Sequence, residues 1–197
     1  FVGDILDDSG SNAYEPLGLD ILTIPLTVFA MLGVINAFNL IDGLDGLCGG
    51  ITLMALAALM GLAFHHGGAV TEFKLLGMVL VTVAAFLIFN LSIVGATRQV
   101  YLGDAGSMVL GLILVYFLIN LSQRGIPIVA SGVPVIKPNS APWLIALPLM
   151  DTVNVMLHRL RSGRSPLRPD RTHIHHLLLD VGMHRYVVLA ILLGLQL

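Results

Sequence analysis

Six apolar runs divide this chain, and their lengths constrain the fold more than any other feature. The runs lie at roughly 19–38, 47–64, 75–94, 106–121, 141–158 and 186–197. Five of them come close to the ~17–25 residues that a membrane-spanning helix needs, and the last begins another. Hydrophobic residues make up 56% of the chain and charged residues only 11%, outside the averages for soluble domains. We therefore predict an all-α, polytopic helical bundle in a membrane, with about five to six transmembrane helices.

The composition also limits the domain organisation and the partners. We expect one transmembrane domain over 1–197, and a fragment truncated at both ends, because the chain begins at Phe1 and stops inside an apolar run at Leu197. The lone Cys48 excludes an intrachain disulfide. A formal net charge of −2, without a long block of like charges, gives no indication of a nucleic-acid partner.

The basic residues are distributed unevenly between the two sides of the predicted membrane. If the run 19–38 passes from outside to inside, one side receives seven basic residues and the other receives three. The seven are Arg98, Arg159, Arg161, Arg164, Arg168, Arg171 and Arg185, and the three are Lys74, Arg124 and Lys137. The positive-inside rule makes the first side cytoplasmic. Segments 39–46, 95–105 and 159–185 are then cytoplasmic, and 1–18 is an extracytoplasmic loop.

Polar residues gather at the end of the first apolar run, from Asn36 to Gly46. A carboxylate at membrane depth is costly unless it faces water, a partner or a metal, so this run predicts a functional site. In a helix, Asn36, Asn39 and Asp42 recur three residues apart, and Asp45 continues the row. Amide and carboxylate oxygens suit Mg²⁺. The alternative is that these residues only cap the next helix, although a cap needs a single residue.

A further acid lies between two glycines, at the start of another apolar run. Asp104 can cap the helix that follows or project towards a cation shared with the first cluster. Asn90 lies near the cytoplasmic end of the preceding run. Both positions fall on the predicted cytoplasmic face, so we expect them to adjoin the Asn36–Gly46 segment.

An acid also lies well inside the apolar run 141–158. Asp151, Asn154 and His158 follow an i, i+3, i+7 pattern, which predicts a polar stripe on one helix. Acids within the membrane usually face the interior of the bundle. A structural pairing and a role in substrate binding are both compatible with that position of Asp151.

The segment 159–176 holds five arginines and three histidines. This composition predicts an anion site, because arginine binds phosphate oxygens in pairs and histidine can donate to them. A loop that touches anionic lipid headgroups explains some of the arginines but explains His173, His175 and His176 poorly. A zinc site is the other rival, although no second group of Cys or His lies on the same face.

Three motifs resemble those of the bacterial polyprenyl-phosphate N-acetylhexosamine-1-phosphate transferases, of the glycosyltransferase 4 type. The motifs are Asn36–Gly46, Tyr101–Ser107 and Arg164–His176, in the order, spacing and membrane side of that family. The resemblance covers nearly the whole chain. The third motif is more similar to that of WecA-type GlcNAc-1-phosphate transferases than to that of the peptidoglycan enzyme MraY.

This resemblance implies an activity and a location. The reaction would transfer GlcNAc-1-phosphate from UDP-GlcNAc to undecaprenyl phosphate, giving GlcNAc-diphosphoundecaprenol and UMP, with Mg²⁺ as cofactor and Mn²⁺ as a substitute. It would take place on the cytoplasmic face of the bacterial inner membrane, as the first membrane step of O antigen, enterobacterial common antigen or teichoic acid synthesis. The alternatives are another UDP-N-acetylhexosamine or MurNAc-pentapeptide phosphotransferase and, in a different class, a membrane transporter.

The resemblance also implies roles for individual residues. Asn39 and Asp104 are the expected metal ligands. The expected catalytic residues are Asp42, Asp45, Asp104 and His173. The expected substrate-binding residues are Asn36, Asn90, Asp151, Arg164, Arg171, His175 and His176. Direct displacement and a covalent intermediate both stay open, and so does a homodimer.

The chain departs from the family pattern at one feature, an Asp-Asp pair at the cytoplasmic end of an earlier helix. Asp7 and Asp8 do not fit it, because 1–18 is predicted to be extracytoplasmic and too few residues remain before Asn36 for another span. We interpret Asp7, Asp8 and Glu15 as a solvated loop. We expect the family's pair to lie upstream, and this 197-residue chain alone to have little or no activity.

Overall fold

The computed structural model describes residues 20–65, 70–124, 135–163, 165 and 173–196. The predicted loop 1–18, with Asp7, Asp8 and Glu15, lies outside the described residues, and so do Arg164 and Arg171. The described residues form helices and turns without any strand, which confirms the predicted all-α class.

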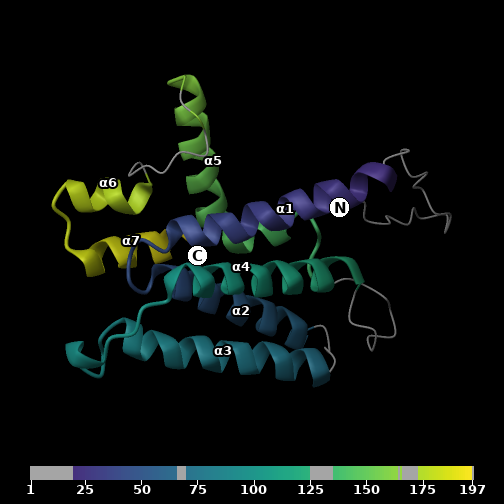
Figure 1. Ribbon diagram of the computed structural model, residues 1–197. Coiled ribbons are helices and arrows are strands. Elements are labelled where there is room, and N and C mark those ends of the chain that lie inside the picture. Colours follow the sequence, from purple (N-terminus) through teal and green to yellow (C-terminus); the bar gives the residue numbers. More distant parts are fainter. Residues whose placement is uncertain (1–19, 66–69, 125–134, 164, 166–172, 197) are drawn as a thin grey trace.

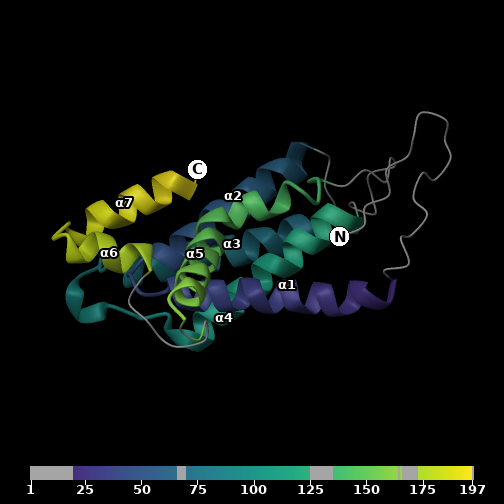
Figure 2. The same cartoon turned by 90° about the horizontal axis from the view of Figure 1, so that it is seen from above.

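Four long helices build the bundle. They are α1 (Asp20–Ile41), α2 (Leu47–His65), α3 (Val70–Asn90) and α4 (Gly103–Ile119). α1, α2 and α3 each contain an apolar window of 18 or 19 residues, and α4 together with the residues that follow it forms one of 20 residues, Gly103–Ser122. All four are long enough to cross a membrane, which confirms the prediction of a polytopic protein. Figures 1 and 2 show that the four helices run alongside one another and alternate in direction.

The remaining described elements are shorter. They are η1 (Ala96–Arg98), η2 (Asn120–Arg124), η3 (Ala141–Ile145), α5 (Ala146–Arg161), α6 (Ile174–Asp180) and α7 (Arg185–Gln196). In Figure 1, α5 rises away from the four long helices, whereas α6 and α7 lie beside one end of the bundle.

The run 141–158 does not form the single continuous span that its length predicts. It divides into η3, a 3₁₀ turn, and α5, a helix of 16 residues. Pro148 lacks the backbone N–H that a continuous helix would donate to the Leu144 carbonyl, whereas Pro142 lies in the first turn of η3, where no such N–H is needed. Gln196 of α7 compensates at the break, since it accepts from Leu147 N at 3.0 Å and donates to the Trp143 carbonyl at 3.1 Å. A partner helix thus satisfies backbone groups that the break releases.

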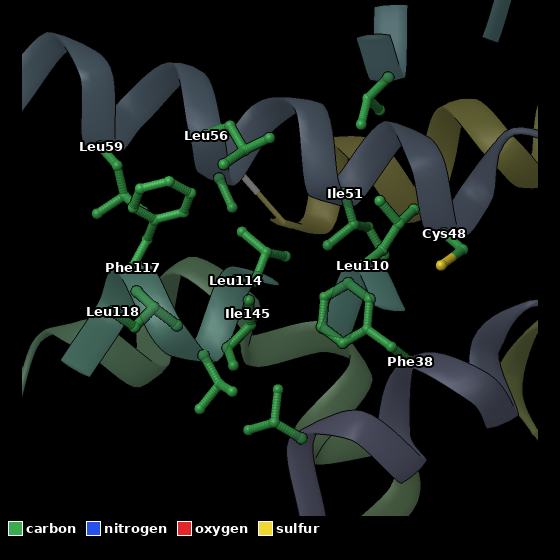
Figure 3. Close-up of a cluster of buried hydrophobic side chains, with 14 of the residues drawn as sticks. Phe38, Cys48, Ile51, Leu56, Leu59, Leu110, Leu114, Phe117, Leu118 and Ile145 are labelled. Atoms are coloured by element: carbon green, nitrogen blue, oxygen red, sulfur yellow. The ribbon is translucent and has the colours of Figure 1, made fainter. Parts of the chain in front are cut away.

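The core lies where α1, α2, α4 and η3 meet (Figure 3). Phe38, Ile51, Leu56 and Leu114 are fully buried there. A Cβ on Gly111 of α4 would lie 3.0 Å from the Cα of Ile35, so the missing side chain lets the backbones of α4 and α1 approach closely. Because lipid is as apolar as these side chains, close packing stabilises such a core more than removal from water does.

The alternation of the helices brings four helix ends together. α1 and α3 end, and α2 and α4 begin, at the same end of the bundle, where α6 and the start of α7 also lie (Figure 1). The segments 39–46 and 95–105 therefore lie close together, as predicted. The polar residues of both segments are concentrated at this end.

Candidate functional site

The connection between α1 and α2 carries the first polar residues. α1 ends at Ile41 and α2 begins at Leu47, so the helical row of Asn36, Asn39 and Asp42, which is conditional on a helix over this segment, does not extend to Asp45. Gly46, directly before α2, has φ +83, a left-handed conformation that suits glycine. Asp42 and Asp45 lie in this turn and are half-buried, whereas Asn36, one turn before the helix end, is exposed.

The turn is held in place by Asn90 at the end of α3. Its Oδ1 accepts from Gly46 N at 2.6 Å, and its Nδ2 donates to the Val100 carbonyl at 2.9 Å. Both groups of this buried amide are therefore engaged with the backbone, which gives Asn90 a scaffolding function here. Its predicted contact with substrate stays a prediction.

Two residues that sequence reasoning missed contact Asp45. Gln99 donates through Nε2 to Asp45 Oδ2 at 3.0 Å and to the Asn90 carbonyl at 3.2 Å. Arg185 Nη1 lies 3.7 Å from the same Asp45 oxygen. Neither residue belongs to one of the three motifs. The sequence shows only that each is polar and lies near the end of an apolar run.

Asn39 and Asp104 meet through Ser107. Asn39 Nδ2 donates to Ser107 Oγ at 3.2 Å, and that hydroxyl donates to the Asp104 carbonyl at 3.0 Å. Asp104 lies in the first turn of α4, whose N-cap position is Leu102, so its side chain is not the cap. Within the described part of the chain, the Asn39 Oδ1 and the exposed Asp104 carboxylate accept no hydrogen bond. We call Asn39, Asp42, Asp45, Asp104 and Ser107 the acid cluster.

The acid cluster concentrates negative charge. Burial, followed by the charges of Asp45 and Asp104, raises the pKa of Asp42 from its ordinary value of 3.8 to about 7. A divalent cation would relieve this repulsion, and free carboxylate and amide oxygens are the ligands that Mg²⁺ prefers. Among the described residues, no three His, Cys, Asp or Glu side chains converge to hold a metal by themselves. The donor set fits a cation that is held by one or two protein oxygens and completed by water or phosphate.

A second group, the histidine cluster, comprises Asp151, His173, His175 and His176. His173 Nδ1 lies 2.8 Å from Asp151 Oδ2, and both side chains are buried. His175 is fully buried, and its ring packs against Gly43 of the α1–α2 turn. Among the described residues, neither ring nitrogen of His175 has a hydrogen-bond partner. Burial first, then His176 and His173, lowers the pKa of His175 to about 4, so this ring is neutral at pH 7.

The contact of His175 with Gly43 joins the two clusters. The ring centroids of His175 and His176 lie 4.2 Å apart, and His176 is half-buried. The predicted stripe on α5 is only partly right, because Asp151 is buried whereas Asn154 and His158 are exposed. The described site is built from the C-terminal ends of α1 and α3, the start of α4, the α1–α2 turn, Asp151 of α5 and the start of α6.

These features define a helical membrane protein with a polar site at one end of its bundle. Its free oxygens suit a cation, and its histidines suit phosphate. The family model described as glycosyl transferase family 4 matches residues 8–122, more than half of the chain. The chain therefore belongs to glycosyl transferase family 4.

Three curated relatives share one name. The chain is 38% identical over 157 residues to the undecaprenyl-phosphate alpha-N-acetylglucosaminyl 1-phosphate transferase of Escherichia coli (strain K12), covering 80% of this chain and 41% of that protein. The Salmonella typhi protein of that name is 40% identical over the same shares. The Haemophilus influenzae protein of that name is 38% identical over 185 residues, 92% of this chain and 50% of its own length. The chain thus spans at most about half of these relatives.

Proposed function

We propose that this chain forms part of a Mg²⁺-dependent enzyme that transfers GlcNAc-1-phosphate from UDP-GlcNAc to undecaprenyl phosphate. The products are GlcNAc-diphosphoundecaprenol and UMP. The observation that carries the proposal is the meeting of the acid cluster and the histidine cluster at one end of a membrane-spanning bundle, where His175 packs on Gly43. The names of the relatives support the same reaction.

The reaction brings two polyanions together, and this determines what the site must supply. An oxygen of the lipid phosphate attacks the sugar-bearing phosphorus of UDP-GlcNAc, a new phosphorus–oxygen bond forms, and the bond to the UMP oxygen breaks. A phosphate monoester with a second pKa near 6 is already mostly dianionic at pH 7, so its attack hardly requires a general base. The protein has to offset charge repulsion and hold the phosphates in line.

The acid cluster is the proposed cation site. Asn39 Oδ1 and the Asp104 carboxylate are the proposed ligands, since Ser107 occupies the Asn39 Nδ2 and leaves its oxygen free. Bound Mg²⁺, or Mn²⁺ in its place, would neutralise phosphate charge as it develops in the transition state. Asp42 and Asp45 shape the acidic surface beside these ligands, and Gln99 holds Asp45 in position.

The histidine cluster is the proposed phosphate side of the site. His173 and the half-buried His176 would donate to phosphate oxygens, and the neutral, buried His175 anchors α6 on the α1–α2 turn. The exposed apolar side chains of α1 and α3, including Phe29, Leu32 and Met78, would contact the lipid around the bundle. We propose that the site faces the cytoplasm from the inner membrane, because the positive-inside rule assigns the segments 39–46, 95–105 and 159–185 to that side.

The decisive experiment measures UMP release. Membranes that contain the protein at its full natural length are supplied with UDP-GlcNAc, undecaprenyl phosphate and Mg²⁺. We expect release that EDTA abolishes and Mg²⁺ restores, that Asp104→Ala removes at equal expression, and that Asp180→Asn leaves unchanged. Asp180 is a suitable control because it is an exposed carboxylate at the far end of α6.

Two other results would redirect the proposal. Turnover of UDP-GalNAc or UDP-MurNAc-pentapeptide in place of UDP-GlcNAc would keep the reaction and change the sugar. Inactivity with every nucleotide-sugar, together with ion-coupled flux in vesicles, would overturn the transferase in favour of a transporter.

A further inference from the structure

Asp151 uses both of its carboxylate oxygens to hold the start of helix α6. Oδ2 contacts His173 Nδ1 at 2.8 Å, and Oδ1 accepts from Ile174 N at 2.9 Å. Asp151 is only 7% exposed and His173 only 3%, so little water competes for these bonds. His173 is the residue directly before α6 and has an extended backbone, with φ −65 and ψ 146. One acid on α5 thus fixes both the ring of His173 and the first amide of α6.

The direction of the first bond determines the tautomer of His173. An ionised carboxylate can only accept hydrogen bonds, so the proton between the two side chains belongs to Nδ1 of the imidazole. A neutral ring then carries no proton on Nε2, which is the nitrogen left for a substrate. When Nε2 also takes a proton and donates to a phosphate oxygen, the carboxylate balances the charge of the imidazolium.

His173 is linked to the acid cluster through its neighbour. The rings of His173 and His175 are stacked, with centroids 5.9 Å apart and an angle of 16° between their planes. His175 in turn packs against Gly43, directly after Asp42. Only the ring of His175 therefore separates His173 from the α1–α2 turn that carries Asp42.

We propose that Asp151 is a positioning residue, which sets the tautomer and orientation of His173 for phosphate binding and does not itself contact the substrate. This replaces the substrate-binding role predicted for Asp151, because both of its oxygens are already occupied by α6. The inference rests on the proposed transferase function. It adds that the nitrogen His173 presents to substrate is Nε2.

Replacement by asparagine separates positioning from simple structural support. In Asp151→Asn, the amide oxygen can still accept from Ile174 N, but the amide nitrogen must donate to His173 Nδ1. In this variant α6 stays docked, while the ring proton of His173 moves to Nε2 and the negative charge that balances an imidazolium is lost.

Asp151→Ala removes both hydrogen bonds. Asn154→Ala, one turn further along α5 and exposed, is the matched control.

The test combines two measurements on the protein at its full natural length. Nitrogen-15 NMR of the His173 ring in lipid nanodiscs, above the pH at which the ring is doubly protonated, reports which nitrogen carries the proton. UMP release reports kcat and KM. For Asp151→Asn we expect an unchanged thermal midpoint, a proton moved from Nδ1 to Nε2, and kcat/KM lowered about 10–100-fold. For Asn154→Ala we expect wild-type values in both measurements.

Two results would overturn the inference. One is a wild-type His173 ring with its proton on Nε2, and the other is an Asp151→Asn variant that keeps full activity although its ring proton has moved. If the wild-type protein releases no UMP from any nucleotide-sugar, the proposed function fails, and with it the catalytic purpose of the pair. The NMR measurement distinguishes that case, because it reports which ring nitrogen of His173 carries the proton next to Asp151 and does not require any reaction.

Discussion

The acid cluster and the histidine cluster adjoin each other but differ in how the fold treats their polar groups. In the acid cluster, the Asp104 carboxylate is exposed and the Asn39 oxygen accepts no bond from the described residues. In the histidine cluster, Asp151, His173 and His175 are buried, and Asp151 has a protein partner for each oxygen. The first cluster leaves oxygens free for the cation that we propose, whereas the second is completed by the packing of α6.

This difference has a consequence for mutations. Changes that remove the free oxygens of Asn39 or Asp104 should affect activity far more than stability, because these oxygens contribute little to the packing of the chain. Changes that remove the contacts of the histidine cluster should affect both, because buried polar groups hold α6 against the bundle.

The largest effect is expected at Asp104. Asp104→Asn removes the negative charge of a proposed cation ligand, so we expect kcat/KM for UMP release to fall about 10²–10³-fold. Because the side chain is exposed and accepts no bond from the described residues, the thermal midpoint should stay within about 2 °C of the wild-type value. Unchanged activity, with Asp180→Asn as the reference, would place the cation elsewhere.

A smaller effect is expected at Gly43, where the two clusters touch. A Cβ added at Gly43 would collide with the His175 ring, so Gly43→Ala should cost about 1–3 kcal/mol through overpacking. Thermal unfolding in detergent measures this cost, and the additional substitution His175→Ala should recover part of it. Gly33→Ala on α1 is the control, because nothing lies within 4 Å of the added Cβ. Equal effects of the two glycine substitutions would contradict the contact.

The next effect depends on pH and concerns Asp42. Its pKa is raised from 3.8 to about 7 in the folded protein, so the unfolded chain releases this proton first as the pH rises. The folded state therefore loses stability between about pH 4 and pH 7 and stays penalised above that window. Asp42→Asn removes the penalty, and we expect its thermal midpoint to exceed the wild-type value by about 2–4 °C at pH 8 and not at pH 4. A difference that is the same at both pH values would contradict the electrostatic cause.

The smallest effect is expected at Arg185. Its guanidinium lies 3.7 Å from Asp45 Oδ2, and the two side chains are 45% and 30% exposed. An ion pair this open to solvent contributes about 0–1 kcal/mol, and Gln99 still holds Asp45 in Arg185→Ala. Thermal midpoints at low and high salt measure the contribution, which should decrease with salt. A loss above about 2 kcal/mol would show that Arg185 supports the histidine cluster as well.

Several features of the fold and site were predictable because their cause is local in the sequence. The apolar runs 19–38, 47–64, 75–94 and 106–121 became helices, since run length and composition decide whether a segment can cross lipid. Their alternation placed Asp42 and Asp104 at one end of the bundle. The continuous span expected over 141–158 was not found, because Pro148 cannot donate the backbone hydrogen bond that a helix needs there.

The sequence by itself determined that this is a membrane-embedded helical chain with Asn39, Asp42, Asp104 and His173 at one end of its bundle, because run lengths and motif order are properties of the chain alone. Only the tertiary structure decided which polar groups are left free and which are used. Asn39 finds Ser107 across 68 residues, and Asp151 finds His173 across 22. Such pairs depend on how distant helices approach each other, and no local pattern encodes that distance.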